Sequence, residues 1–166
     1  MEIVLDGFAV MRRDGSIYTV AVDPEDFDRV EAAGSWYVAP GGRTFYAQRT
    51  VRSATGRRTT ERLHNFILGA KGIDHVDGNG LNNCKANLRL ATLAQNHQNR
   101  RGPDSQNISG YRGVSFDKKR GKWQAEVQVE GHRHYLGRYA TAAEAGAAAS
   151  RVRAKIMPFS ADAREV

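Results

Sequence analysis

Hydrophobic and polar residues alternate along several short stretches in the first half of the chain, and this period of two predicts β-strands. Residues 8–12 and 17–22 are predicted to pair as a hairpin, because Asp14-Gly15 between them is a typical hairpin turn. Residues 36–38 and 44–51 are predicted to form a second hairpin. The first half of the chain is therefore expected to be rich in antiparallel strands.

Helical signals lie between and after these hairpins. A short helix is expected over residues 24–33, because an Asp-Pro pair opens the segment and a glycine follows it. A second short helix is expected over residues 60–68. Thr92 and Gln95 have the spacing of a capping box, in which each side chain accepts a hydrogen bond from the other residue's backbone. This pattern predicts a third helix from residue 93 to about residue 100.

The pattern changes in the last third of the chain. Residues 101–109 show no periodicity and contain Gly, Pro, Asp and Ser, so we interpret them as a linker. Residues 122–129 alternate strictly between apolar and polar side chains, and residues 113–116 and 132–136 are predicted to form strands on either side. An alanine-rich helix with its own capping box is expected over residues 141–155.

Composition narrows the class of protein. The chain has 166 residues, 40% of them hydrophobic, and its single cysteine excludes a disulfide framework or a cysteine-rich zinc site. The net charge is +7, but residues 1–31 carry −5, so the remainder carries +12. This excess suits a polyanionic partner, although a merely soluble basic surface would show it too. Neither a signal-peptide pattern nor an apolar stretch near the ~20 residues of a membrane span occurs, which predicts a protein that is neither secreted nor membrane-bound.

The side chains with the clearest chemistry lie between residues 74 and 96. Asp74 and His75 are adjacent, Asn87 follows, and Asn96 lies on the capped helix. Mg²⁺ prefers oxygen ligands and keeps several waters, so the Asp74 carboxylate and the Asn96 amide oxygen suffice if a substrate phosphate supplies another ligand. His75 can accept a proton from water at neutral pH. The set predicts metal-dependent hydrolysis of a phosphodiester bond.

This stretch resembles the HNH (His-Asn-His) endonucleases, in the branch common among phage-encoded homing-type enzymes. The residues that carry the resemblance are Leu63-His64, Asp74-His75-Val76-Asp77-Gly78-Asn79, Leu81-Asn82-Asn83, Asn87-Leu88-Arg89 and Gln95-Asn96 to Asn99-Arg100. It implies one divalent metal per active site, Mg²⁺ or Mn²⁺, held by Asp74 and Asn96. It also implies His75 as the general base and Asn87 as the residue that holds the loop and orients His75.

Residues 109–159 resemble the plant ethylene-response (Apetala-type) DNA-binding domain. The residues that carry this resemblance are Tyr111-Arg112-Gly113-Val114, Gly121-Lys122-Trp123, Ala125-Glu126-Val127, Leu136-Gly137 and Thr141 to Ala148. In that family a three-stranded sheet lies in the DNA major groove and a helix packs behind it. By position, the resemblance implies DNA contacts from Arg112, Gln128, Arg133 and Tyr135.

Other side chains have less specific expected roles. The remaining predicted DNA-binding residues are Lys118, Lys119, Arg120 and Lys122, which are expected to bind phosphate, together with Arg89 and Arg100. His64 is either a DNA contact or a structural residue packed beside Phe66. Trp123 is expected in the core, because it shares a strand face with apolar residues.

The sequence therefore predicts an α+β protein of two domains. Residues 1–100 form the HNH nuclease domain, in which β-hairpins lead into a ββα-metal core over about residues 62–100, and residues 101–109 link it to residues 110–160. That second domain is expected to be a three-stranded antiparallel sheet packed on one helix. The expected substrate and partner is double-stranded DNA, with no small-molecule cofactor and no membrane partner.

The expected function is that of a metal-dependent DNA endonuclease, of homing type, which nicks DNA or cuts both strands as a monomer or a DNA-assembled dimer. A cytoplasmic location is expected, in a bacterial or phage-infected host cell and in association with the nucleoid. The alternative is a sequence-specific DNA-binding regulator with an inactive HNH domain. An RNA-directed nuclease is a third possibility, disfavoured because the stacking aromatics typical of single-strand binders are sparse.

Overall fold

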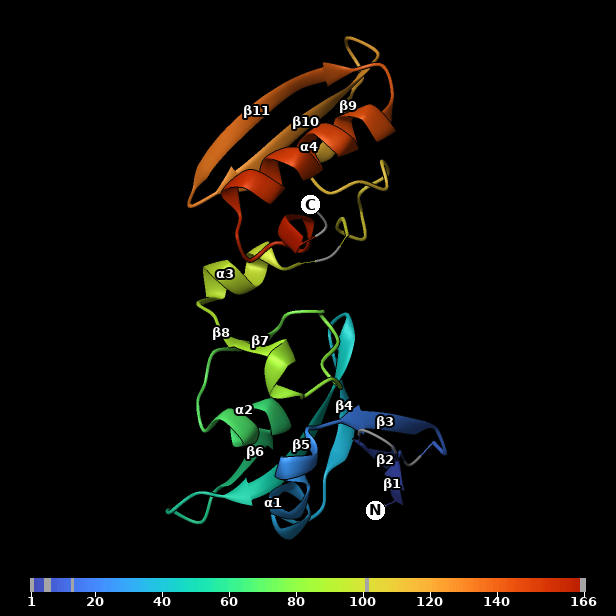
Figure 1. The fold of residues 1–166 in the computed structure, drawn as a ribbon. Coiled ribbons are helices and arrows are strands. Elements are labelled where there is room, and N and C mark those ends of the chain that lie inside the picture. Colours follow the sequence, from blue (N-terminus) through green and yellow to red (C-terminus); the bar gives the residue numbers. More distant parts are fainter. Residues whose placement is uncertain (1, 5–6, 13, 101, 165–166) are drawn as a thin grey trace. The chain divides into compact units, whose positions relative to one another are not determined.

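The computed structural model describes residues 7–12, 14–100 and 102–164, together with the backbone of residues 2–4 (Figure 1). The chain divides into two compact units, residues 1–91 and residues 92–166. Each unit has its own hydrophobic core. The division falls before the capped helix, which the sequence had assigned to the nuclease domain. The predicted domain limits and the linker at residues 101–109 stay a prediction, and residue 101 lies outside the described residues.

The N-terminal unit begins with two antiparallel three-stranded sheets. The first has the order β1 (Glu2–Val4), β2 (Gly7–Met11) and β3 (Ile17–Ala21), and the second has the order β4 (Tyr37–Gly41), β5 (Thr44–Arg52) and β6 (Arg58–Arg62). Between the sheets lie a 3₁₀ turn, η1 (Pro24–Asp26), and helix α1 (Phe27–Ala32). The two predicted hairpins are therefore present with small shifts at their ends.

The rest of this unit is built around a small hairpin. Helix α2 (Leu63–Leu68) precedes β7 (Ile73–His75), and β7 pairs antiparallel with β8 (Leu88–Leu90) across a loop that ends in the turn η2 (Lys85–Asn87). Phe8, Val20, Val30 and Leu63 are fully buried, so the first sheet and both helices contribute to one core.

The predicted helix over residues 60–68 is partly wrong. Its first residues form strand β6, in which Thr59 and Thr60 pair with Val51 and Thr50 of β5, and only Leu63–Leu68 is helical. Two adjacent β-branched threonines pack well on a pleated surface and weaken a helix. The helix ends at Gly69, which has a φ of +62°, a conformation that glycine adopts without strain.

The C-terminal unit contains a sheet packed on one long helix. Helix α3 (Leu93–Gln98) opens the unit, and strands β9 (Val114–Asp117), β10 (Lys122–Val129) and β11 (His132–Tyr139) form an antiparallel sheet with β10 in the centre. Helix α4 (Ala142–Ile156) lies along one face of that sheet, and a 3₁₀ turn, η3 (Ala161–Arg164), follows it (Figure 1). The predicted sheet-and-helix arrangement is thus present, and both predicted capping boxes have formed.

Small side chains allow α4 to lie close to the sheet. Ala145 and Ala149 of the helix pack on Ala125 and Val127 of β10, and all four residues are buried. Trp123 is partly buried against this cluster, as expected. Since these residues cover one face of the sheet, the alternate residues of β10 face the other side.

Among the described residues, no helix is both long enough and apolar enough to cross a membrane.

Candidate functional site

The face of the C-terminal sheet opposite α4 is polar and exposed. Strand register places Gln124, Glu126 and Gln128 of β10 on this face, opposite Arg138, Tyr135 and Arg133 of β11, respectively. Arg133 and Tyr135 share this face by strand alternation, and a register shift between Ala125 and Glu126 brings Arg138 to the same face. Three of the predicted DNA-binding residues, Gln128, Arg133 and Tyr135, therefore lie side by side.

The aromatic ring of Tyr135 lies between two arginines on this face. Tyr135 is 51% exposed, although it is a large aromatic side chain. The Arg138 guanidinium lies 5.5 Å from the ring centroid, within cation–π range. Arg133 forms an ion pair of 3.5 Å with Glu126 across the strands. Arg138 is thus held beside the ring, and Arg133 is held by Glu126 on the same exposed side of the sheet.

Asp117 organises the edge of the same face. Its carboxylate accepts hydrogen bonds from Arg138 Nε at 3.0 Å and Arg120 Nη1 at 3.2 Å. Partial burial acts against ionisation, but these hydrogen bonds outweigh it and lower the pKa of Asp117. Arg138 was missed by the sequence analysis, because only the strand register shows that it faces the same side as Tyr135.

The turn between β9 and β10 adds exposed positive charge. The turn contains Lys118, Lys119 and Arg120. Lys122 begins β10 on the exposed face, opposite Asp117 in the strand register. All four predicted phosphate-binding residues are therefore on the surface at one end of the sheet. No carboxylate among the described residues pairs with the three lysines.

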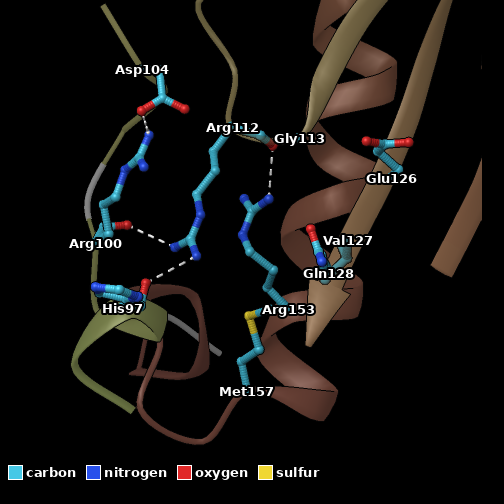
Figure 2. A pocket seen from close by; sticks show the side chains of 10 residues that line it. All are labelled: His97, Arg100, Asp104, Arg112, Gly113, Glu126, Val127, Gln128, Arg153 and Met157. Atoms are coloured by element: carbon cyan, nitrogen blue, oxygen red, sulfur yellow. Dashed lines mark hydrogen bonds and ion pairs between the residues drawn. The ribbon is translucent and has the colours of Figure 1, made fainter. Parts of the chain in front are cut away.

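Arg112 has a different environment from the one that the family resemblance implied. Its guanidinium donates to the backbone carbonyl of Gln98 at 2.8 Å. It also donates to those of Arg100 at 2.7 Å and His97 at 3.2 Å (Figure 2), so it caps the C-terminal end of α3. Burial lowers the pKa of Arg112, and the charges of Arg153 and Arg100 add to the effect. The structure thus commits this side chain to internal hydrogen bonds within the C-terminal unit.

Neighbouring side chains complete this arrangement beside a cavity of about 450 Å³. Arg153 is 7% exposed, and its Nη1 donates to the backbone carbonyl of Arg112 at 2.8 Å (Figure 2). Its Nε donates to Asp162 at 2.7 Å. Arg100 pairs with Asp104. Of the predicted DNA-binding residues, Arg100 and Arg112 are therefore engaged inside their own unit.

Asp74 and His75 lie on β7 in the N-terminal unit, and both are buried. Asp74 Oδ2 accepts hydrogen bonds from Arg89 at 3.0 Å from Nε and 2.8 Å from Nη2, because β7–β8 pairing places the two residues directly opposite each other. Arg89, predicted to bind DNA, therefore neutralises the predicted metal ligand. A cation at Asp74 would share its carboxylate with this arginine.

His75 lies among polar and aromatic side chains. Its Nε2 donates to Asn83 Oδ1 at 3.4 Å, and its ring lies 4.8 Å from the His64 ring in an edge-to-face arrangement. Burial lowers the pKa of His75, and the hydrogen bond with Asn83 and the charges of Asp77 and Asp74 partly oppose this effect. His75 is therefore neutral at pH 7, the state that a general base requires.

Two buried polar atoms in this cluster have no hydrogen-bond partner among the described residues: His64 Nδ1 and Asn83 Nδ2. His64 is 3% exposed and Asn83 fully buried. His64 packs within the unit, as its structural alternative proposed. The rings in contact with it are those of His75 and Tyr46, whereas the sequence analysis named Phe66. Asn83 belongs to the stretch that resembles the HNH endonucleases, but the sequence analysis did not predict its contact with His75.

The loop between β7 and β8 is tied together by Asn87. Its Nδ2 donates to Asp77 Oδ1 at 2.9 Å and to the Asn82 carbonyl at 2.8 Å, while its Oδ1 accepts from the Asp77 amide at 2.9 Å. Asp77 also accepts from Asn82 Nδ2. These bonds hold the loop that follows His75, and a catalytic role for Asn87 stays a prediction. Asn96 lies on α3 in the other unit.

No protein-family model and no solved structure matches the chain. The chain is 47% identical over 62 residues to Protein 3.8 of Escherichia phage T7, an alignment that covers 37% of this chain and 50% of that protein. It is also 33% identical over 111 residues to the AP2-like ethylene-responsive transcription factor TOE2 of Arabidopsis thaliana, covering 66% of this chain and 22% of that protein. The chain thus spans half or less of these curated relatives. Neither is described as a nuclease, so membership of the HNH family stays a prediction.

Proposed function

We propose that this protein binds duplex DNA through the exposed face of the β9–β10–β11 sheet. The observation that carries the proposal is the position of Tyr135, half exposed between Arg133 and Arg138 on the face that α4 leaves open. A β-ribbon fits the major groove of B-form DNA, where arginine recognises guanine and an apolar surface contacts the thymine methyl group. The partial similarity to an AP2-like transcription factor supports DNA binding.

The polar side chains on this face are suited to two kinds of DNA contact, to phosphates and to bases. Lys118, Lys119, Arg120 and Lys122 can pair with phosphates, which sets affinity and orientation but carries little sequence information. Arg133 and Gln128 lie opposite each other on this face, near the turn that joins β10 to β11, where they can reach base edges. Glu126 pairs with Arg133 and Asp117 pairs with Arg138, so both arginines are restrained before DNA binds, which reduces the entropy lost on binding.

Fluorescence anisotropy with a labelled duplex of mixed sequence tests this proposal. Arg133→Ala and Tyr135→Ala combined are expected to weaken binding by at least about tenfold, since contacts of this kind contribute roughly 1–3 kcal/mol each. The matched control is Arg151→Ala, on the exposed side of α4, which is expected to bind like the parent. Equal affinities for all three proteins would overturn the proposal.

A second candidate function, phosphodiester hydrolysis, is favoured by one specific observation. A neutral, buried His75 adjoins the carboxylate of Asp74 on β7, and Asn87 holds the loop that follows. We propose that this cluster makes the protein an endonuclease of the HNH homing type. With Nε2–H donating to Asn83, Nδ1 is the nitrogen whose lone pair can accept the proton of the attacking water.

We propose that the reaction uses one hard divalent cation, Mg²⁺ or Mn²⁺, for which Asp74 would offer a carboxylate and Asn96 an amide oxygen. Such an ion supplies positive charge where negative charge develops on the phosphoryl group. Arg89 would keep the Asp74 side chain oriented through its two hydrogen bonds. Asp74 belongs to the N-terminal unit and Asn96 to the C-terminal unit.

Conversion of supercoiled plasmid to nicked circles tests hydrolysis separately from binding. The parent is expected to nick DNA with Mg²⁺ or Mn²⁺ and to stop when a chelator is added, whereas His75→Gln and Asp74→Asn should bind duplex DNA but not cut it. A parent protein that binds DNA and never nicks it with either metal would leave the regulator with an inactive HNH domain as the remaining function.

A further inference from the structure

The β5–β6 hairpin of the N-terminal unit has one face that carries arginines and no acidic side chain. Register places Gln48 opposite Arg62, Thr50 opposite Thr60 and Arg52 opposite Arg58, so these six residues share a face. All except Gln48 are exposed. The described residues contain no carboxylate that pairs with the three arginines. We call this surface the arginine face.

The opposite face of the same hairpin is neutralised and packed. Arg49 Nε donates to Glu61 Oε2 at 2.8 Å, and the Arg49 guanidinium lies 5.1 Å from the Trp36 ring and 4.7 Å from the Phe66 ring. Ala47 on this face is 1% exposed. The only acidic residue of β6, Glu61, is therefore committed to Arg49 on the other side. The positive charge of the hairpin is concentrated on the arginine face.

Folding alone does not account for this distribution. Arg52 and Arg58 are direct cross-strand partners, and like charges in that position destabilise a sheet. The threonines between the arginines offer hydroxyl donors, a combination that suits phosphate oxygens. From Arg58 to Arg62 the strand advances about 13 Å, which matches roughly four phosphates of one DNA strand at about 3.4 Å along the helix axis.

The arginine face is continuous with the candidate catalytic cluster. Tyr46 is the next residue of β5 on that face, and the Arg62 guanidinium lies 4.6 Å from its ring centroid. The Tyr46 ring in turn lies 5.8 Å from the ring of His75 and 5.7 Å from that of His64. A phosphate backbone bound along the arginine face would therefore end beside Tyr46, whose ring contacts the buried rings of His64 and His75 within the same compact unit.

We infer that the arginine face is a second DNA-binding surface, which binds the phosphate backbone of duplex DNA independently of sequence. This inference rests on the proposed DNA binding and assigns the N-terminal unit its own part in it. Because the contacts are to phosphates, they add affinity and salt dependence and leave sequence preference to the C-terminal sheet.

The salt dependence of binding by the full chain provides the test. The probe is a labelled 30-base-pair duplex of mixed sequence, titrated by anisotropy between 50 and 200 mM KCl. For Arg52→Gln with Arg58→Gln, the slope of log K against log[salt] is expected to fall by about 1.8 in magnitude, or about 0.9 for each lost phosphate contact, and the affinity at 100 mM KCl by at least about tenfold.

Two variants control for charge and folding. Arg151→Gln with Lys155→Gln changes the net charge equally on the exposed side of α4, and Arg52→Lys with Arg58→Lys keeps the charge on the hairpin; both are expected to retain the parental slope. Removing the like-charge pair should not lower the thermal midpoint of the glutamine variant. Arg58→Gln alone, with an expected slope change of about 0.9, replaces the double variant if that protein does not fold.

The outcomes separate this inference from the proposed function. If the hairpin variant binds like the α4 control while Arg133→Ala with Tyr135→Ala loses affinity, the arginine face has no role and the C-terminal face keeps its function. If neither set of substitutions weakens binding, both proposals fail. A loss confined to a structured RNA hairpin, with duplex DNA binding unchanged, would overturn the assignment of DNA as the partner.

Discussion

Acidification below pH 6.5 is expected to destabilise the N-terminal unit, because His64 is buried in a place that cannot accommodate a charge. The side chain is 3% exposed, and its Nδ1 has no hydrogen-bond partner among the described residues. The groups that face it are the His75 and Tyr46 rings and the charge of Arg62. Burial lowers the pKa of His64 to about 3, and interactions with His75 and Arg62 add to the shift.

The size of the effect follows from the difference in proton binding. The ordinary pKa of histidine is 6.5, so between pH 6.5 and 3 the unfolded chain binds a proton that folded His64 does not. Stability therefore rises with pH in this window and is complete above pH 6.5. Each pH unit below 6.5 costs about 1.4 kcal/mol, which gives about 2 kcal/mol at pH 5. His75, whose pKa is also lowered, adds to the loss in the same direction.

Urea unfolding at pH 7.5, 6.5 and 5.0 measures this loss. A Trp123→Phe background leaves Trp36, which is 7% exposed in the N-terminal unit, as the fluorescent reporter. His64→Gln cannot titrate, so subtracting its pH dependence from that of the parent removes the contribution of His75 and the carboxylates. The difference is expected to be about 2 kcal/mol between pH 6.5 and 5.0. Identical pH dependence in the two proteins would refute this account of His64.

Three further predictions concern the C-terminal unit, each measured as a thermal midpoint by circular dichroism. Arg112→Ala removes the donor to three carbonyls at the end of α3 and should cost roughly 1–3 kcal/mol, whereas an unchanged midpoint would contradict the capping role. Gly146→Ala should destabilise by about 1–3 kcal/mol despite alanine's helix propensity, since its Cβ would lie 2.3 Å from Tyr111 Cδ1. Asp162→Ala leaves buried Arg153 without its carboxylate and should cost about 3–5 kcal/mol; a loss under 1 kcal/mol would contradict this.

The sequence predicted elements well where the signal was local. The strict alternation of residues 122–129 corresponds to β10, and the capping boxes at Thr92 and Thr141 mark the starts of α3 and α4. The prediction of a helix over residues 60–68 was partly wrong, because pairing with β5 determines the conformation of its first residues. Such pairing is non-local, and a periodicity analysis does not detect it.

The candidate sites required contacts between distant residues. The resemblance to a DNA-binding family placed Arg112 at a DNA-contact position, yet its guanidinium bonds to carbonyls of residues 97, 98 and 100. Likewise, the register of β7 and β8 places Arg89 opposite Asp74. The sequence analysis predicted separate roles for them, DNA binding for Arg89 and metal binding for Asp74. The arginines of β5 and β6 lie close together in the sequence, but only the strand register shows which of them share a face.

Photocrosslinking to duplex DNA tests the central claim most directly. A duplex that carries 5-iododeoxyuridine in place of thymidine is irradiated with the full chain, and the crosslinked peptides are identified by mass spectrometry. If the exposed face of the C-terminal sheet enters the DNA groove, crosslinks are expected at Tyr135 and its neighbours on β10 and β11. Crosslinks confined to the exposed side of α4, with the β11 peptide unmodified at saturating DNA, would contradict the claim.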